Sequence, residues 1–575
     1  MNVILDHTRS LPLEEIIAVG TGKTTVSLAP ATRSMLAERR QQIERSIVEQ
    51  EFPAYGFNRG FGHNVDLSVK TEDLSKLQEN LILSHSVGAG EPMDETVVRV
   101  TMLLRANSLA RGYSGVRPEL VEAFINMLNA GITPQVPELG SVGASGDLAP
   151  LSHIAMALIG RGRVAYRGEV VEAGAALKAA RLTPFSLQMK EGLALTNGVQ
   201  FMNAIGLVSC HKLKIMLRSA AVESALTAQV MLAPDTYYRP DFHAVRPHPG
   251  AVRVADWIWR LMQDSPIRNS HRDFKTDGQV QDPYNVRCAA QILGAAHDLI
   301  NQAETSLLIE ANSATDNPIL LEDTDGLHVD VVSGGHFHGM PVAVQVYNLM
   351  QALGIMAGLS HQRSVRFVDP NRNKGLGRDL KWPDLSHDDR SISSGMMMLE
   401  YASASLLNSI WGDAMPSHLF NISTNSGQED HVSMGTGLAV RLLKAIPKAS
   451  HIMGIELAYI IQAIAIRKRL DTIPTEVDLP QWVDKELGAL KSRMNGQGDG
   501  VIFDACVIRE HPLTEAEKTF SPACEALYRT VRERDLFPIV EKDRFMADEV
   551  SGLSGFILSG ELIEAVSTQI KLDWD

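Results

Sequence analysis

The hydrophobic pattern of the chain changes near residue 200. From about 200 to 313, and again from about 340 to 470, apolar residues recur at helical spacing with few Gly or Pro breakers. The windows 295–313 and 435–469 are especially long. Helices of this length usually pack together as a bundle. The pattern therefore predicts a central region, 201–475, built from a bundle of very long helices.

The two flanking regions have shorter periodic segments. Residues 1–200 mix short apolar runs with Gly and Pro at 60–62, 131–134 and 160–162, which predicts a loop-rich N-terminal domain of broken helices with a few short strands. Beyond 475 the helical periodicity resumes on a smaller scale. We expect a mainly α chain with domains over 1–200, 201–475 and 476–575.

Composition narrows the class of partner. The 575 residues are 45% hydrophobic and 21% charged, as in a soluble globular protein. Asp and Glu number 68 against 54 Lys and Arg, and the net charge of −14 argues against nucleic acid or an anionic membrane as partner. The apolar stretch 342–359 is interrupted by Gln345, Asn348 and Gln351, so it predicts a buried helix and no membrane span.

The cysteines and the N-terminus favour the cytoplasm as the compartment. The four cysteines show no CxxC spacing, and the first residues, MNVILD, lack a basic region followed by a long apolar run. Neither a disulfide framework nor a secretory signal is predicted.

The most reactive feature of the chain is the tripeptide Ala144-Ser145-Gly146, within residues 140–147 (GSVGASGD). Because Gly146 lacks Cβ, its amide nitrogen can approach the carbonyl carbon of Ala144. The Ser145 hydroxyl can leave as water, and loss of two waters gives a 4-methylidene-imidazol-5-one ring (MIO), which is an electrophile. An isolated Ala-Ser-Gly is far more often an ordinary turn. The surrounding sequence therefore decides whether this tripeptide is interpreted as a ring-forming segment or as a turn.

Residues 140–153 (GSVGASGDLAPLSH) resemble the MIO segment of the aromatic amino acid ammonia-lyases and 2,3-aminomutases, and the likeness is closest to the histidine ammonia-lyases. Further matches follow the family order at 55–62 (YGFNRGFG), 83–85 (LSH), 197–200 (NGVQ), 281–287 (QDPYNVR), 333–339 (SGGHFHG) and 428–434 (QEDHVSM). These ordered matches span most of the chain, and the last twenty or so residues lie outside the resemblance. The resemblance implies an aspartase/fumarase-like fold and a homotetramer whose active sites draw on three subunits.

The resemblance assigns Tyr55 as the base of an ammonia elimination. This reaction takes a proton from the weakly acidic β-carbon while the amine, captured by the electrophile, departs. A phenol has an ordinary pKa of about 10, so positive potential such as that of helix N-termini is needed to favour phenolate. Gly56, Gly60 and Gly62 give the loop freedom to close over substrate. The alternative is a tyrosine packed in a glycine-rich turn.

Four residues are expected to bind the substrate, hold the electrophile or assist proton transfer. The planar guanidinium of Arg287 suits the substrate carboxylate. Tyr284, three residues earlier, can share its helix face and resembles the residue that assists proton transfer near the ring. Asn197 and Gln281 resemble the amides that hold the electrophile's oxygen and the substrate. A surface salt bridge for Arg287, or structural roles for the amides, are the alternatives.

Three further residues are expected to contact the amine or the ring of the substrate. Glu429 resembles the carboxylate that faces the amine or the ring, and in apolar surroundings it needs a donor nearby. His85 and Phe337 resemble the residues at the ring end, where a histidine can hydrogen-bond an imidazole or a phenol. An isolated His85 would more often be a core histidine, but together with Glu429 it favours histidine as substrate.

Three positions depart from the family pattern. His336 stands where Asn is usual, Arg59 replaces a small Thr, and Met340 takes a position that is often acidic in histidine lyases. The added cations at His336 and Arg59 would suit a different or more acidic substrate. We nevertheless include His336 among the expected substrate-binding residues.

Two other motifs carry less weight. Residues 20–25 (GTGKTT) resemble half a phosphate-binding loop, but the first glycine of that motif would fall at Ile17, so no nucleotide is predicted. His336 and His338 are too few ligands for a metal site, and no metal is predicted.

The resemblance thus implies a MIO-dependent ammonia-lyase of an aromatic L-amino acid, with L-histidine to urocanate as the leading reaction. A tyrosine or phenylalanine ammonia-lyase and an aromatic 2,3-aminomutase are the alternatives. A catalytically silent homologue with a structural or binding role is a further alternative.

Overall fold

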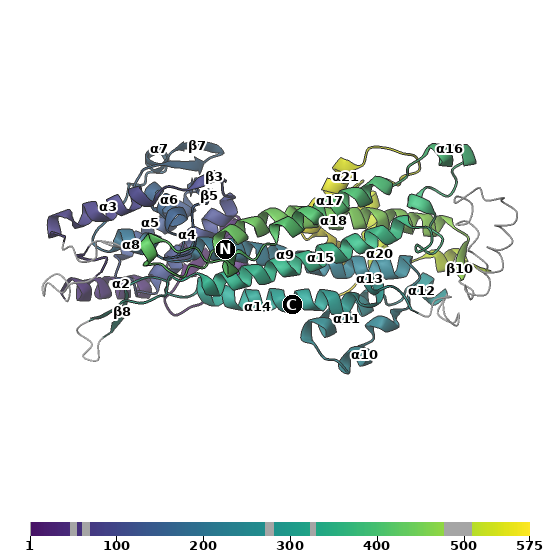
Figure 1. The fold of residues 1–575 in the computed structure, drawn as a ribbon, viewed down its shortest axis with the longest axis horizontal. Helices are drawn as coiled ribbons and strands as arrows, with labels where there is room; N and C mark the ends of the chain where they lie inside the picture. The colour runs from purple at the N-terminus through teal and green to yellow at the C-terminus, as the bar shows by residue number, and fades with distance from the viewer. Residues whose placement is uncertain are drawn as a thin grey trace. The chain divides into compact units, whose positions relative to one another are not determined.

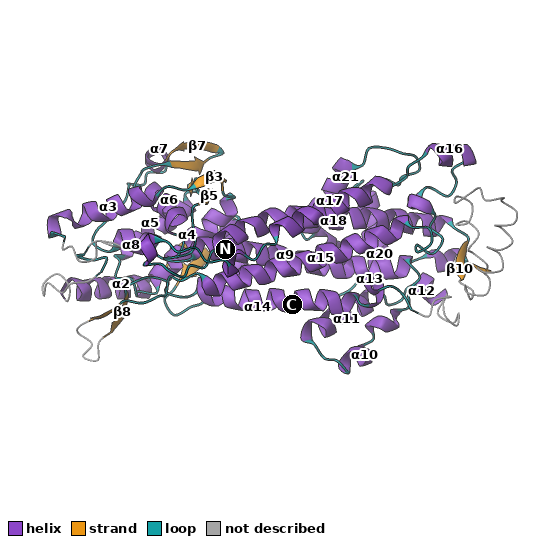
Figure 2. Cartoon of the chain, viewed as in Figure 1, coloured by secondary structure: helices purple, strands orange, loops and turns teal. Residues whose placement is uncertain are grey.

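Helices dominate the structure, which is a computed structural model that describes residues 2–45, 55–59, 69–270, 281–322, 329–475 and 509–574. Figure 2 shows that the strands are short and few beside the helices. The expectation of a mainly α protein is therefore confirmed.

The chain forms two compact units, and each is drawn from three segments. The first unit comprises Met1–His211, Asn301–Met350 and Ala414–Leu443, and the second comprises Lys212–Ile300, Gln351–Asp413 and Lys444–Asp575. The boundaries expected near 200 and 475 from the sequence stay a prediction.

Short helices of the first unit begin at residues suited to helix N-termini. Pro30 and Pro118 occupy the first turns of their helices, where the missing N–H costs nothing. The Asp94 side chain accepts a hydrogen bond from Thr96 N at 2.9 Å and caps the next helix. The short helices of this unit are α1 Leu13–Gly20, α2 Pro30–Ile43, α3 Leu74–His85, α4 Glu95–Ala110, α5 Pro118–Asn129, α6 Leu148–Leu158, α7 Ala173–Ala179 and α8 Glu191–Thr196.

The described strands form small sheets. In the first unit β1 (Asn2–Leu5) pairs in parallel with β2 (Thr25–Leu28), and the other pairs are antiparallel. The antiparallel pairs of this unit are β3 Ala89–Pro92 with β5 Pro137–Leu139, β4 Thr133–Pro134 with β6 Arg163–Tyr166 and β7 Glu169–Glu172, and β8 Ile319–Glu322 with β9 Val329–Val332. In the second unit β10 (Thr472–Thr475) pairs with β11 (Arg509–Pro512).

The long helices are α9 Gln200–Val230, α14 Ala289–Ala311, α15 Met340–Val368 and α18 Gly435–Arg469 (Figure 1). Within the first unit, Gly206 of α9 lies against Leu307 of α14 and Val346 of α15. Within the second unit, Arg363 of α15 binds Glu456 of α18 and Ser224 of α9. The long helices thus pack on one another, as the periodicity predicted.

The second unit adds shorter helices: α10 Pro240–Ala244, α11 Pro249–Leu261, α12 Pro266–Ser270, α13 Tyr284–Arg287, α16 His387–Ile392, α17 Met397–Asp413, α20 Pro522–Glu533, α21 Ala547–Leu558 and α22 Glu561–Ser567. The apolar side chains of Met398, Tyr401 and Trp411 on α17 are exposed. Large exposed apolar faces are rare on monomers.

By length and composition alone, two helices of the described chain are apolar enough to cross a membrane, or three if the bent pair α21 and α22 forms one span. These two are α15 and α18, and 61% and 94% of their apolar windows are buried within the protein. Packing inside the chain therefore covers nearly all of the α18 window and the larger part of the α15 window.

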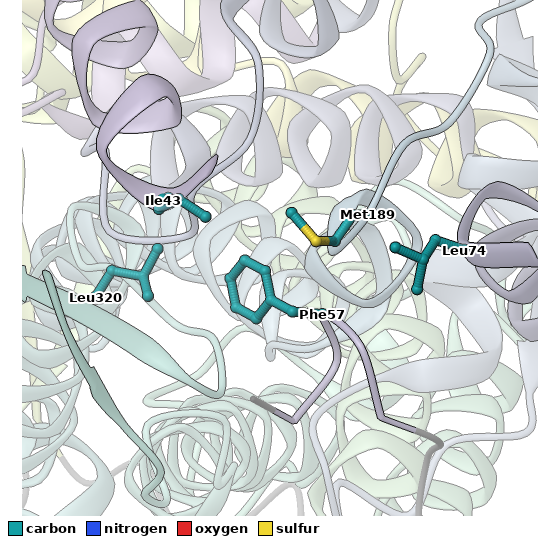
Figure 3. Packing of buried hydrophobic residues seen from close by; sticks show 5 residues of the cluster. All are labelled: Ile43, Phe57, Leu74, Met189 and Leu320. Carbon is teal, nitrogen blue, oxygen red and sulfur yellow. The ribbon is translucent and has the colours of Figure 1, made fainter. Parts of the chain in front are cut away.

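A hydrophobic cluster anchors the short segment 55–59 in the first unit. Figure 3 shows the Phe57 ring in the middle, with Ile43 and Leu320 on one side and Met189 and Leu74 on the other. Phe57 and Ile43 are fully buried. Burying a phenylalanine side chain contributes about 1.5–3 kcal/mol, so Phe57 holds the segment that carries Tyr55 against the helical body.

Candidate active site

A cavity of about 700 Å³ in the first unit brings together seven of the residues expected from the sequence. They are Tyr55, His85, Ala144, Ser145, Asn197, Phe337 and Glu429. The wall is completed by Leu81, Leu148, Leu193, Asn317, Ser333, His338, Asn425, Gln428, Asp430 and His431. The volume lies within the range of small-molecule sites.

The Ala144-Ser145-Gly146 segment is pressed against the Asn197-Gly198 turn. Gly146 has φ +78°, and a Cβ built on it would lie 2.2 Å from Gly198 O. Asp147 N donates to the same carbonyl at 2.7 Å. Only glycine fits here, both because of the left-handed backbone and because of the close approach. The loop is thus held in close contact with the Gly198 backbone.

The carboxyl of Asp147 fixes the loop from the other side. It is fully buried and accepts hydrogen bonds from Ser141 Oγ at 2.7 Å, Thr436 Oγ1 at 2.8 Å and Met202 N at 2.8 Å. Burial raises the pKa of Asp147, while these hydrogen bonds oppose the shift. The carboxyl ties the loop to the starts of α9 and α18.

Glu429 faces the central serine. Ser145 Oγ donates to Glu429 Oε1 at 3.0 Å, and Thr424 Oγ1 donates to the other carboxylate oxygen at 2.6 Å. Thr424 and Glu429 also form an isolated backbone bridge, which fixes the backbone beneath the carboxylate. Glu429 therefore lies beside the Ser145 side chain.

The ring of His85 is held in one tautomer. Its Nδ1 lies 2.8 Å from Leu81 O, one helical turn earlier on α3, and 3.0 Å from Ser84 Oγ, whose hydroxyl donates to the same carbonyl at 3.0 Å. Since a carbonyl oxygen only accepts, Nδ1 carries the proton and Nε2 is the acceptor. His85 thus presents an acceptor in the cavity wall, which suits a substrate ring with an N–H or O–H group.

A buried ion pair supports Asn197. Lys190 Nζ donates to Asp316 Oδ1 at 2.9 Å and to Asn317 O at 3.1 Å, and both charged groups are fully buried. Asn197 Nδ2 donates to the same Asn317 carbonyl at 3.2 Å. Burial lowers the pKa of Lys190, and the Asp316 carboxylate opposes this shift. The pair therefore holds the turn that orients Asn197.

The amide oxygen of Asn197, Oδ1, is buried and lacks a hydrogen-bond partner among the described residues. Leaving such an acceptor unpaired costs about 1–3 kcal/mol. An N–H group of a ligand in the cavity would satisfy it.

Comparison with known proteins identifies the family. The model of the aromatic amino acid lyases matches residues 11–482. The chain belongs to this family.

Similar proteins include ammonia-lyases and aminomutases. A histidine ammonia-lyase of Gloeobacter violaceus is 40% identical over 461 residues, which cover 80% of this chain and 87% of that protein. The crystal structure of histidine ammonia-lyase from Trypanosoma cruzi has a TM-score of 0.80 and 29% identity over 100% of this chain and 96% of its own. Tyrosine aminomutase from Streptomyces globisporus has a TM-score of 0.84 and 27% identity, covering 100% of both chains. The predicted family and the predicted class, a carbon–nitrogen lyase, are confirmed.

Three expected site residues belong to the second unit. Gln281 is exposed, and Tyr284 is 67% exposed beside a separate groove of about 480 Å³. The guanidinium of Arg287 lies 4.6 Å from the centre of the Tyr284 ring, and Arg287 Nε donates to Asp282 O at 2.8 Å. The shared helix face of Tyr284 and Arg287 is thus observed, but none of the three lines the Ser145 cavity.

The structure separates the two histidines of the 333–339 segment. His336 is exposed and does not line the cavity, whereas His338 does. His338 Nε2 lies 3.0 Å from His431 O, and Met340 N donates to His338 Nδ1 at 3.3 Å. Among the described residues no cluster of three or more His, Cys, Asp or Glu could hold a metal.

The glycine-rich segment at 20–25 has the wrong setting for a phosphate loop. Gly20 ends α1, and strand β2 begins at Thr25. A phosphate loop instead follows a strand and opens a helix.

Some wall residues were not predicted from the sequence. The Asn317 side chain accepts hydrogen bonds from Ser333 Oγ at 3.1 Å and Gly334 N at 2.8 Å, so it joins the 317 turn to the Phe337 segment. His431 and Asp430 directly follow Glu429 in the family motif at 428–434. Their position next to Glu429 was the sequence signal that could have identified Asp430 and His431 as wall residues.

Proposed function

We propose that the protein eliminates ammonia from L-histidine to give urocanate. The observation that carries this proposal is a single cavity that combines Ser145, Tyr55 and Glu429 with the acceptor nitrogen of His85. The similarity to curated histidine ammonia-lyases over most of the chain supports the same substrate.

The proposed cofactor is MIO, formed from Ala144-Ser145-Gly146 without metal or nucleotide. The residues fit its formation because position 146 accepts only glycine against the Gly198 backbone and the Ser145 hydroxyl already has a hydrogen-bond partner in Glu429. Once formed, the ring would supply an electrophilic carbon that takes up the substrate's amine.

The base in this proposal is Tyr55, which removes the β-proton. The cavity includes Leu148, the first residue of α6, so the positive end of that helix dipole meets the site. A phenolate base at Tyr55 requires positive potential of this kind. The anchored Phe57, two residues on, limits the positions that Tyr55 can take.

The remaining wall residues bind and orient. His85 Nε2 accepts the imidazole N–H of the substrate, and Phe337 packs on the ring. Asn197 Oδ1 accepts an N–H group, which ends its unpaired state. Glu429 lies where it can hold the departing amine, since it is next to Ser145.

We further propose a cytoplasmic homotetramer in which Gln281, Tyr284 and Arg287 of the partner subunit complete each site. Two observations support assembly: the apolar face of α17 is exposed, and Tyr284 stands exposed beside an apolar groove. In such a site Arg287 of the partner subunit would bind the substrate carboxylate.

The second candidate is a lyase or 2,3-aminomutase acting on tyrosine or phenylalanine. The acceptor nitrogen of His85 suits a phenol O–H as well as an imidazole N–H, and one similar structure is a tyrosine aminomutase. Phenylalanine has no such donor, so this geometry favours it least. A silent homologue is a weaker alternative, since the cavity retains the serine, the tyrosine and the glutamate together.

A product screen tests the proposal. The purified protein is incubated separately with L-histidine, L-tyrosine and L-phenylalanine, and unsaturated acid, ammonia and β-amino acid are followed by liquid chromatography and mass spectrometry. We expect urocanate from histidine, and none from a Ser145→Ala control. Turnover of tyrosine alone would shift the assignment to the second candidate, and no turnover of any substrate would contradict both.

A further inference from the structure

Helix α3 (Figure 1) carries a buried glutamine, Gln78. Leu81 and His85 of this helix belong to the cavity wall. Gln78 lies three residues before Leu81 and therefore on the same face. It is fully buried and does not touch the cavity, so its polar side chain needs a reason to be there.

The Gln78 amide joins two backbone segments. Its Nε2 donates to Gly56 O at 3.2 Å, and its Oε1 accepts from Leu193 N at 3.1 Å. Because one partner is a carbonyl and the other an N–H, the orientation of the amide is fixed. Leu193 N belongs to the first turn of α8, whose N–H groups have no partner within the helix. Gln78 therefore satisfies a helix end and holds the residue next to Tyr55.

The backbone segments around the Gln78 amide are closely packed. A Cβ on Gly192 would lie 2.6 Å from Gln78 O and 2.9 Å from Gln78 Cα, so α3 and α8 meet with their backbones in contact. Gly56 has φ +75°, and a Cβ there would lie 2.4 Å from Leu193 Cδ2. The segment carrying Tyr55 thus rests directly on α8, which ends next to Asn197.

We infer that Gln78 is a positioning residue for Tyr55. Its amide fixes the Tyr55 segment relative to α8, and so relative to Asn197 and the Gly198 backbone against which Gly146 is pressed. The inference rests on the proposed function, in which Tyr55 removes the β-proton. A displacement of about 1 Å between a base and its proton can cost about 100-fold in rate, and the Gly56 anchor is one residue from that base.

The test uses the full-length protein with Gln78→Met, which keeps the side-chain length but removes both hydrogen bonds. The matched control is Ser75→Ala on the same helix, which removes a side-chain hydrogen bond to Leu187 O at 2.7 Å without touching the Tyr55 segment. For each protein we would measure the mass deficit of two waters, kcat and KM for L-histidine, and the isotope effect with β-deuterated substrate.

We expect Gln78→Met to keep the mass deficit and a KM within about threefold of the original, while kcat falls at least about tenfold and the isotope effect rises. The isotope effect rises because proton removal becomes slower than the other steps. Ser75→Ala should keep kcat and the isotope effect. A merely structural role for Gln78 would change thermal stability but not the isotope effect.

Gln78→Glu provides a second, independent readout. Its carboxyl keeps an acceptor for Leu193 N, but it can donate to Gly56 O only when protonated. The ratio of its kcat to that of the unaltered protein should therefore fall as pH rises.

Any one of three results would overturn the inference when the unaltered protein is active. The first is an unchanged kcat in both Gln78 variants, and the second is a kcat ratio of Gln78→Glu to the unaltered protein that does not depend on pH. The third is loss of both the mass deficit and the activity in Gln78→Met. The last would mean that Gln78 builds the ring-forming loop. Absence of turnover in the unaltered protein would instead overturn the proposed function, so the two failures are distinguishable.

Discussion

Replacing Gly146 with alanine tests whether the close approach of two backbones drives ring formation. The new Cβ would lie 2.2 Å from Gly198 O, 2.4 Å from Gly198 C and 2.6 Å from Gly198 N. An ordinary contact to carbon begins near 3.4 Å, so the loop must move by about 1 Å. A displacement of this size costs about 100-fold in a positioned reaction, or about 2.7 kcal/mol.

The substitution also strains the backbone, since alanine at φ +78° costs about 1–2 kcal/mol. Gly168→Ala separates the two effects. Gly168 has a similar φ of +82°, but a Cβ there has nothing within 4 Å. Both variants should lose about 1–2 kcal/mol of unfolding free energy from strain, and only Gly146→Ala should lose the ring.

The assay is intact-mass spectrometry of the two purified variants, with urea unfolding measured in parallel. We expect Gly168→Ala to show the full mass deficit of two waters and Gly146→Ala to show little or none after the same time. A complete mass deficit in Gly146→Ala would refute the reasoning, because the ring would then form without the close approach. Loss of the deficit in Gly168→Ala would refute it as well, since strain elsewhere would suffice.

Three further predictions test the site. Tyr55→Phe should keep the mass deficit while kcat falls by at least about 100-fold, because a general base contributes about 10²–10⁴-fold. Activity and intact mass are measured on one sample. Full activity of this variant would show that Tyr55 is not the base. His85→Phe removes the acceptor nitrogen Nε2 of the ring that Leu81 O orients. The kcat/KM for histidine should therefore fall by about tenfold or more, as for loss of one hydrogen bond, while the kcat/KM for phenylalanine should not fall. A parallel fall for both substrates would contradict ring recognition by His85. Burial raises the pKa of Glu310 to about 7 from 4.5. Between these two pH values the Glu310 carboxyl is neutral in the folded chain and ionised in the unfolded chain. The free energy of unfolding therefore decreases as pH rises from about 4.5 to 7. Glu310→Gln should therefore stabilise the protein at pH 8, by at most about 3 kcal/mol, and much less at pH 5 in urea unfolding; equal effects at both pH values would contradict the shift.

The sequence predicted the parts of this molecule that depend on local pattern. The long helices α9 and α18 were visible as sustained apolar periodicity, because a helix buried on most sides keeps its pattern over many turns. The Ala144-Ser145-Gly146 chemistry could be predicted from the sequence because it needs three adjacent residue types. Tyr55, His85 and Glu429 were found through motifs that resemble the family, and the structure places all three in one cavity with Ser145.

Contacts between distant segments could not be read from the sequence. Gln78 bonds to a backbone N–H that lies 115 residues away, and Lys190 binds Asp316 across 126 residues. No local periodicity reports such pairs. The segment 333–339 shows the same limit, since it lies outside regular helix or strand. Without a period to assign faces, the sequence could not tell that His338 lines the cavity while His336 is exposed.

The most direct test of the central claim is the product formed from L-histidine by protein whose intact mass has been measured. The account predicts a mass lower than that of the unmodified chain by two waters, and urocanate with one ammonia released per turnover. A full-length mass without the deficit, accompanied by urocanate formation, would contradict the proposed electrophile. The deficit without any turnover of histidine would contradict the proposed substrate.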